Sequence, residues 1–269
     1  MKATVFLGGG RITAALLAGL HLAEYRVPVI VHDRNPHKLR SLKKEFGVGS
    51  EPDLLRAADQ AKLLVVAVRP SDVPAVLADL RALPRKANLV ACSLAAGISV
   101  KNLQRMLGPP VRWARAMPSP VARFGHGLTA VTFPTRIPQS VKGLVRNFFE
   151  QVGEVVEVPE RQFDAFTVTY SASHGYHALA TLARAARDLG LQERIARVAA
   201  AHALGDSIVA WRDERASLDA LLQEAATPGG IAASVMRAMD QAGYQKIISR
   251  GLKAGVVRAQ KNARKSGEA

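Results

Sequence analysis

Three consecutive glycines, Gly8-Gly9-Gly10, follow an apolar run and precede a segment rich in alanine and leucine. This order predicts a strand that turns tightly into the N-terminus of a helix, where backbone N–H groups and the helix dipole favour a pyrophosphate. Gly8 allows the tight turn, and Gly10 keeps any Cβ away from the phosphates. Thr13 stands where the dinucleotide fingerprint asks for a third small residue, so a plain glycine turn stays open as the alternative.

The residues after the second apolar run bear on the adenosine half of such a ligand. Asp33 lies about 25 residues after Gly8, near the position at which a dinucleotide fold meets the adenine ribose. Its carboxylate would accept a hydrogen bond from a free 2′-hydroxyl, which favours NAD(H). Arg34, Asn35 and Lys38 could instead hold a 2′-phosphate. Together with the net charge of +15, these residues favour NADP(H) slightly over NAD(H).

The composition indicates a globular protein that binds anions. The 269 residues are 48% hydrophobic and 22% charged, enough for one large domain or two ordinary ones. Basic residues are spread along the chain, and aromatic residues make up only 5%, so no basic run is interleaved with aromatics that could stack on bases. The charge therefore favours a phosphate-bearing cofactor and an anionic small molecule over nucleic acid as partners.

No segment predicts export, membrane insertion or metal binding. No apolar run reaches the length that spans a bilayer, and Met1-Lys2 leads directly into an apolar run without the pattern of a signal peptide. The single Cys92 excludes an internal disulfide, and no Cys/His cluster has metal-ligand spacing. We therefore expect a cytoplasmic protein with no metal site and no membrane partner.

Strand and helix patterns alternate in the first half of the chain, whereas the second half is helical. We expect strands at residues 4–7, 27–32, 63–68, 88–93, 111–116, 128–133 and 154–158. We expect helices between them at 12–24, 36–46, 72–80, 99–107 and 140–150. Further helical patterns cover 176–189, 192–211, 218–225 and 231–242. The order predicts an α/β fold, with a parallel, doubly wound sheet of the Rossmann type in residues 1–158 and an all-α domain in residues 159–269.

Six short motifs occur in order along nearly the whole chain. They are Gly8 to Ala14, Val66 to Pro70 after the third strand, Leu94 to Gly97 after the fourth, Arg115-Ala116-Met117-Pro118, Phe163 to Tyr176, and Thr227-Pro228-Gly229-Gly230. Each motif alone has low specificity, but their order and spacing together are specific. In both respects the chain resembles the pyrroline-5-carboxylate reductase family.

The resemblance implies NAD(P)H-dependent reduction of a cyclic imine, 1-pyrroline-5-carboxylate, to L-proline in proline biosynthesis. It also implies a homodimer or a ring of dimers, built through helices that are rich in alanine and leucine. The predicted cofactor-binding residues are Gly8, Gly10, Arg11, Ile12, Arg34, Asn35, Arg69, Pro70, Ala95, Ala96 and Met117. The predicted substrate-binding residues are Ser173, Thr227, Gly229 and Gly230.

The implied chemistry suits these residue types. Hydride transfer needs the nicotinamide held face-on to the carbon of the C=N bond, and a protonated imine is electrophilic without a metal. The substrate carboxylate needs an anion site. Pro228-Gly229-Gly230 stands before a helix and would supply an anion site through the free N–H groups of the helix start, as Gly8-Gly9-Gly10 would for the pyrophosphate. A plain helix–helix turn is the alternative.

Three departures from the family pattern leave the substrate open. Ser119-Pro120-Val121 replaces the family's Asn-Thr-Pro, and Ile231-Ala232 replaces two threonines whose hydroxyls would hydrogen-bond the imine. His174 stands where the family has proline. It is a candidate proton donor to the product amine, with an ordinary surface or packing histidine as the alternative. A related reductase of a different imine or oxo substrate, and an inactive dinucleotide-binding regulatory homologue, therefore stay open as alternatives.

Overall fold

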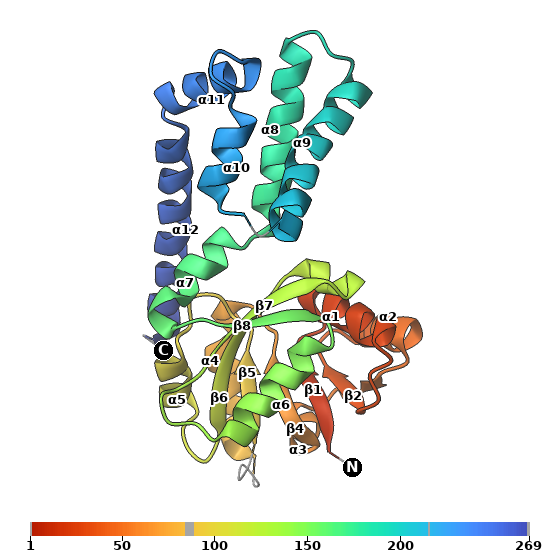
Figure 1. Ribbon diagram of the computed structural model, residues 1–269. Helices are drawn as coiled ribbons and strands as arrows, with labels where there is room; N and C mark the ends of the chain where they lie inside the picture. The colour runs from red at the N-terminus through yellow and green to blue at the C-terminus, as the bar shows by residue number, and fades with distance from the viewer. Residues whose placement is uncertain (1, 84–88, 215, 268–269) are drawn as a thin grey trace. The chain divides into compact units, whose positions relative to one another are not determined.

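The computed structural model describes residues 2–83, 89–214 and 216–267, and contacts divide the chain into two units (Figure 1). The first, here called the sheet unit, comprises the chain up to Tyr170 together with the chain from Gly255. The second, the helical unit, is Ser171–Ala254. The predicted boundary between residues 158 and 159 marks where strand patterns stop in the sequence, and as a domain boundary it stays a prediction.

Eight strands form one sheet in the order β3-β2-β1-β4-β5-β6-β7-β8. They are β1 (Ala3–Leu7), β2 (Val29–His32), β3 (Gly49–Ser50), β4 (Ala61–Val66), β5 (Val90–Ser93), β6 (Arg112–Pro118), β7 (Gly127–Thr132) and β8 (Gly153–Glu157). Neighbouring strands run parallel except β6 and β7, which pair antiparallel. β1 is buried along its whole length, as expected of an apolar strand covered on both faces.

Helices cover both faces of this sheet. They are α1 (Arg11–Leu22), α2 (Pro36–Phe46), α3 (Leu54–Asp59), α4 (Val73–Asp79), α5 (Val100–Met106), α6 (Gln139–Glu150) and α7 (Glu160–Thr169), with 3₁₀ turns η1 (Pro70–Asp72), η2 (Leu80–Ala82) and η3 (Pro120–Phe124). Val5 and Leu7 of β1 belong to the core with α3, α4 and α5, whereas Phe6 belongs to the core with α1, α2 and α6. The sheet is therefore doubly wound, and Figure 1 shows α6 over one face.

The sheet unit differs from the sequence predictions at three places. β3 and α3 lie where the sequence predicts no element, because β3 is two exposed residues and α3 is only six residues long. β7 runs antiparallel to β6, although a wholly parallel sheet is expected. Only residues 119–126 join these strands, whereas a parallel crossover needs roughly a dozen residues or more. The start of the strand expected at residue 88 lies outside the described residues.

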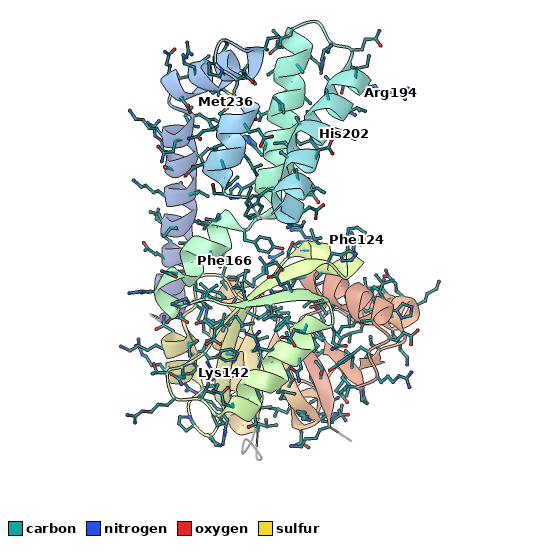
Figure 2. All side chains as sticks on the ribbon, viewed as in Figure 1. Phe124, Lys142, Phe166, Arg194, His202 and Met236 are labelled. Atoms are coloured by element: carbon teal, nitrogen blue, oxygen red, sulfur yellow. The ribbon has the colours of Figure 1, made fainter. Side chains whose placement is uncertain are left out.

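The helical unit consists of α8 (Ala172–Asp188), α9 (Glu193–Glu214), α10 (Leu218–Ala225), α11 (Ile231–Gln241) and the first part of α12 (Tyr244–Gly267). α8 and α9 pack against each other across a short turn, and Figure 2 labels His202 on α9 and Met236 on α11. Among the described residues of this unit, the buried hydrophobic side chains are Ala183, Ala196 and Ala200. The described part of the helical unit therefore buries no large apolar side chain within one copy of the chain.

α1 lies close to η3 because Gly19 has no side chain. A Cβ at Gly19 would overlap the carbonyl oxygen of Ala122 and would lie 2.9 Å from a methyl carbon of Val152. Gly143 in α6 is a contrasting case, since a Cβ there would meet nothing within 4 Å. The close approach at Gly19 thus allows α1, which follows the glycine turn, to pack against η3, which follows β6.

We expect Gly19→Ala to lower the free energy of unfolding by about 1–3 kcal/mol, because the added methyl group overpacks the contact between α1 and η3. Gly143→Ala is the matched control. It should raise the free energy of unfolding by about 0.5–1 kcal/mol, because alanine favours a helix interior. Urea unfolding measures both changes. A Gly19→Ala protein as stable as the wild type would show that α1 does not need this close approach.

Candidate active site

The glycine turn joins β1 to α1 at the carboxyl edge of the sheet. Gly8 has a φ of +108°, and a Cβ there would lie 2.8 Å from the carbonyl oxygen of Ala67. Gly10 is the N-cap of α1, and no described side chain caps the helix there. A Cβ at Gly10 would meet nothing within 4 Å, and the first turn of α1 holds no acidic residue. The start of α1 therefore has N–H groups that no described side chain caps and open space around Gly10, which suits a pyrophosphate.

Thr13 secures the glycine turn from the first turn of α1. Its side chain is wholly buried, and its hydroxyl donates a 2.6 Å hydrogen bond to the carbonyl oxygen of Gly8. The third small residue of the dinucleotide fingerprint is thus replaced by a side chain that binds the turn directly. Close helix packing, which a third glycine usually allows, occurs further along α1 at Gly19.

The carboxylate of Asp33 braces the same turn from the end of β2. Its Oδ2 accepts the Gly9 N–H at 2.7 Å and the Lys38 ammonium at 3.3 Å, and its Oδ1 accepts the Asn35 N–H at 2.8 Å. Burial alone would raise the pKa of Asp33, but the hydrogen bonds from Asn35, Gly9 and Lys38 outweigh it, so the pKa lies below its ordinary value. Both oxygens of Asp33 therefore already bind donors of the protein.

The residues predicted to face a 2′-phosphate differ in whether their side chains already make hydrogen bonds or ion pairs within the protein. Asn35 caps α2, since its side-chain oxygen accepts the His37 N–H at 2.9 Å. Lys38 is paired with Asp33 at 3.3 Å. Arg34, between Asp33 and Asn35 in the chain, is exposed. Arg34 is therefore the exposed guanidinium that this segment offers to a phosphate.

The carboxyl ends of β4, β5 and β6 lie along the same edge as the glycine turn, because these strands follow β1 in parallel order. Arg69 and Pro70 come after β4, with Arg69 exposed and Pro70 half-buried. Ala95 and Ala96 come after β5, with Ala95 buried. Met117 lies near the end of β6 and is half-buried against Phe163 and its neighbours. The structure thus brings the predicted cofactor residues to one edge, the usual place for a nucleotide in such folds.

The predicted substrate residues belong to the helical unit and form a second set. Ser173 and His174 are exposed in the first turn of α8. Thr227 and the two glycines form the turn before α11, where Gly229 has a φ of +78° and the Gly230 N–H donates to the Thr227 carbonyl at 2.9 Å. Gly230 is the N-cap of α11, with no cap from a described side chain. The start of α11 thus offers N–H groups to an anion in the same way as α1.

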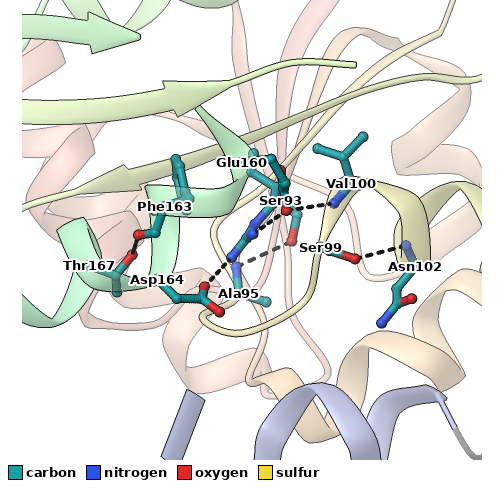
Figure 3. Close-up of polar contacts among 10 residues, drawn as sticks. Ser93, Ala95, Ser99, Val100, Asn102, Glu160, Phe163, Asp164 and Thr167 are labelled. Atoms are coloured by element: carbon teal, nitrogen blue, oxygen red, sulfur yellow. Dashed lines mark hydrogen bonds and ion pairs between the residues drawn. The ribbon is translucent and has the colours of Figure 1, made fainter. Parts of the chain in front are cut away.

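An ion cluster around the buried Arg115 has no role in the sequence predictions, and its two acids are partly exposed (Figure 3). Arg115 of β6 is 2% exposed, and its guanidinium contacts Glu160 at 2.6 Å and Asp164 at 3.0 Å. The same guanidinium lies 4.4 Å from the centre of the Phe163 ring. The signal that could have found the cluster is the four-residue spacing of the two acids, which places them on one face of α7.

Other chemistry is limited in the part of the chain that the structure describes. No group of three or more histidine, cysteine, aspartate or glutamate side chains there could hold a metal ion. No described helix combines the length and the apolar character that crossing a membrane requires. Burial raises the pKa of the Cys92 thiol, which keeps it protonated and makes it a packing residue.

We expect Asp33→Asn to lower the free energy of unfolding at neutral pH by about 1–2 kcal/mol, because an amide accepts weaker hydrogen bonds than a carboxylate. The folded-state pKa of Asp33 is lowered. Its contribution is therefore complete above the unfolded-state pKa of about 4 and is lost as the pH falls through the folded-state pKa. Urea unfolding of wild type and variant at neutral and acid pH measures this. A stability difference that grows in acid would contradict the lowered pKa.

Two family models match the chain. Residues 4–95 match the model described as NADP oxidoreductase coenzyme F420-dependent, which spans the glycine turn and the strand ends up to Ala95. Residues 160–262 match the model described as pyrroline-5-carboxylate reductase dimerisation, which spans α7 to α11 and most of α12.

Solved structures share the fold. The pyrroline-5-carboxylate reductase from Coxiella burnetii has a TM-score of 0.87 at 23% identity and covers 97% of this chain and 98% of that chain. The Plasmodium falciparum pyrroline carboxylate reductase with NADP bound has a TM-score of 0.85 at 18% identity, with coverage of 97% and 98%.

Curated relatives are similar over nearly the whole length. The pyrroline-5-carboxylate reductase of Mycobacterium leprae (strain TN) is 30% identical over 287 residues, covering 97% of this chain and 96% of the relative. That of Mycobacterium tuberculosis (strain ATCC 25618 / H37Rv) is 30% identical over 289 residues, with coverage of 97% and 96%. The resemblance in the motifs is thus confirmed, and the chain belongs to the pyrroline-5-carboxylate reductase family of NAD(P)H-dependent oxidoreductases that act on a C=N bond.

Proposed function

We propose that this protein transfers a hydride from NADPH to 1-pyrroline-5-carboxylate and thereby forms L-proline. One observation carries the proposal: the uncapped start of α1 lies behind a glycine turn at the carboxyl edge of a parallel sheet. That arrangement suits the pyrophosphate of a dinucleotide. The substrate is proposed from the relatives, which are named pyrroline-5-carboxylate reductases.

The bound nicotinamide would supply the hydride, and the chain would hold and shield it. The N–H groups of Arg11 and Ile12 at the start of α1 would bind the pyrophosphate. Ala95 and Ala96 have small side chains after β5, and Met117 lies on the neighbouring strand β6, so these residues would border the ring. Small and apolar neighbours would bring the ring close to the substrate carbon and exclude water from it.

A preference for NADPH over NADH rests on how Asp33 is used. Its two oxygens bind Gly9, Asn35 and Lys38, so the carboxylate is engaged before a ribose hydroxyl arrives. Lys38 also offsets the negative charge that would repel a 2′-phosphate. The exposed Arg34 would bind that phosphate with its planar guanidinium.

The helical unit would hold the substrate. The N–H groups at the start of α11, after Gly229 and Gly230, would bind the substrate carboxylate. His174 would supply the proton that the imine nitrogen keeps in the product amine, and with the hydride added to the carbon the C=N bond becomes CH–NH. Ser173 and Thr227 would add hydroxyl groups to the same site.

A different imine or oxo substrate is the second candidate, and Ile231 is the observation that favours it. Ile231 follows the glycines before α11 and is 86% exposed, where the family pattern has a threonine hydroxyl. A site that lacks this hydroxyl would discriminate less strongly for the imine. An inactive dinucleotide-binding homologue is the third reading of the same departure.

A steady-state assay of NADPH and NADH oxidation with 1-pyrroline-5-carboxylate tests the proposed function, and we expect the higher kcat/KM with NADPH. Gly10→Asp should fold, because Gly10 is extended (φ −86°, ψ −174°) and its Cβ would meet open space. Its carboxylate should weaken NADPH binding on the order of 100-fold, because it repels phosphate at the helix start. Gly10→Asn, of equal size without the charge, is the control and should lose less.

The outcomes of this assay separate the alternatives. Tight cofactor binding without turnover of 1-pyrroline-5-carboxylate, but with turnover of another imine or oxo acid, would favour the second candidate. Tight binding without turnover of any of them would favour the inactive homologue. Unchanged NADPH affinity in Gly10→Asp would overturn the glycine turn as the phosphate site.

We further propose a homodimer built through the helical unit, with a ring of dimers as a larger assembly of the same contact. Ile195, Val198 and Val209 of α9 lie on one helix face and are each more than half exposed. A second exposed row on α11 consists of Ile231, Val235 and Met239. Because the hydrophobic side chains buried among the described residues of this unit are alanines, a second copy would cover its large apolar side chains.

Val198→Asp should weaken dimer formation on the order of 10-fold or more, because it places a carboxylate in an apolar interface. Sedimentation velocity over a concentration series measures the change. Val27→Asp is the control, because it introduces the same aspartate at an exposed valine of the sheet unit. It should leave the association unchanged. Equal association of both variants with the wild type would exclude this face of α9 from the interface.

A further inference from the structure

The ion cluster of Arg115, Glu160 and Asp164 joins two elements of the sheet unit. The Arg115 Nη1 donates to Glu160 Oε1 at 2.6 Å, and its Nη2 donates to Asp164 Oδ1 at 3.0 Å. Phe163, between the two acids on α7, packs its ring against the guanidinium. The first two turns of α7 are thereby fastened to β6.

Stability alone is a poor explanation for this cluster. Burying a guanidinium removes its hydration, and an ion pair often does no more than offset that cost. The Arg115 Nε and the Glu160 Oε2 are buried and have no hydrogen-bond partner among the residues that the structure describes. Apolar side chains of similar volume often stabilise a protein as well as a buried ion pair does, so we look for the role of Arg115 in the geometry that its contacts impose.

Glu160 carries that geometry to the loop after β5. Its Oε1 also accepts the N–H of Val100, the first residue of α5, at 3.3 Å (Figure 3). The other end of the loop is held by Ser93, whose hydroxyl accepts the Ala95 N–H at 3.2 Å. The loop with Ala95, Ala96 and Gly97 is thus fixed at both ends, and one end depends on Glu160.

The loop is also bounded from a third side. Gly97 has a φ of +81°, and a Cβ there would overlap the backbone of Ala259 in α12. On β6, Met117 comes two residues after Arg115 and therefore lies on the same face of the sheet. Met117, which is proposed to border the nicotinamide, is therefore close to Arg115 on β6. Ala95 and Ala96, which are proposed to do the same, lie in the loop that Glu160 holds.

We propose that Arg115 is a positioning residue for hydride transfer, which acts through Glu160 on the Ala95–Gly97 loop while Asp164 orients its guanidinium. This rests on the proposed function. The planar guanidinium binds both carboxylates at once, whereas a lysine ammonium at the same place could not reach both with the same geometry. The proposed phosphate site is the glycine turn before α1, so we expect the cluster to affect the reaction geometry more than cofactor binding.

Glu160→Gln and Arg115→Lys test the proposal in the full-length protein, with Glu157→Gln as the matched control. Glu157 is paired with Lys142 at 2.7 Å in the same unit and has no contact with the loop in the described structure. In both test variants kcat should fall about 10- to 100-fold, because displacement of the reacting groups by about 1 Å costs that much. The KM for NADPH should stay within about threefold, and the isotope effect with deuterated NADPH should rise because hydride transfer limits the rate. The control should match the wild type.

A purely structural role predicts another result. In that case activity falls only in proportion to the folded fraction, and the isotope effect and the KM stay unchanged, which would overturn the proposal. Amide hydrogen exchange supplies a readout that does not depend on turnover. Glu160→Gln should speed exchange at the Val100 N–H by roughly tenfold and leave exchange at the start of α1 unchanged.

The two hypotheses fail in different ways. If the wild type oxidises no NADPH with 1-pyrroline-5-carboxylate, the proposed function fails. The exchange rate of the Val100 N–H then tests by itself whether Glu160 holds the Ala95–Gly97 loop. An unchanged rate in Glu160→Gln would overturn that role.

Discussion

The 2.7 Å hydrogen bond from the Gly9 N–H to Asp33 holds the glycine turn to the end of β2. β1 and β2 are parallel neighbours, so this bond joins two strand ends just beyond the paired part of the ladder. It sets the direction in which α1 leaves the turn and therefore the place to which the positive end of its dipole points. The acceptor is a carboxylate, which makes the bond stronger than one to a neutral oxygen, and the bond in turn helps to lower the pKa of Asp33. The other strand ends contribute to the candidate site because the sheet order puts them along the same edge.

Much of the fold could be predicted because its signals are local. α2 and α10 have the predicted bounds, since Asn35 and Ser217 cap their first turns. The central strands are apolar runs with chain-breaking residues at their ends, and the doubly wound sheet and the family resemblance are confirmed. β3 could not be predicted, because two exposed residues carry no apolar period. The antiparallel direction of β7 could not be predicted either, because it depends on where β6 ends and how little chain remains before β7.

The candidate site also contains features that the sequence could predict and features that it could not. The glycine turn is a pattern of adjacent residues, so the sequence alone was enough to propose it. Arg115 lies 45 residues from Glu160 and 49 from Asp164, and only the packing of α7 on β6 brings these charges together. The engagement of Asp33 by Gly9 likewise depends on side-chain geometry across two strand ends. His174 and the residues before α11 stay predictions, since their roles depend on a bound substrate.

The two outermost strands of the sheet bear on how copies of this chain meet. β3 is only two residues long, and β8 carries the exposed carboxylates of Glu154 and Glu157. A short edge offers few free backbone groups to a foreign strand, and charged side chains on a longer edge, here Glu154 and the ion-paired Glu157, disfavour its pairing. Edge-to-edge growth into aggregates is thereby discouraged at both borders of the sheet. The apolar faces of α9 and α11 then remain for the proposed homodimer, which is a closed assembly.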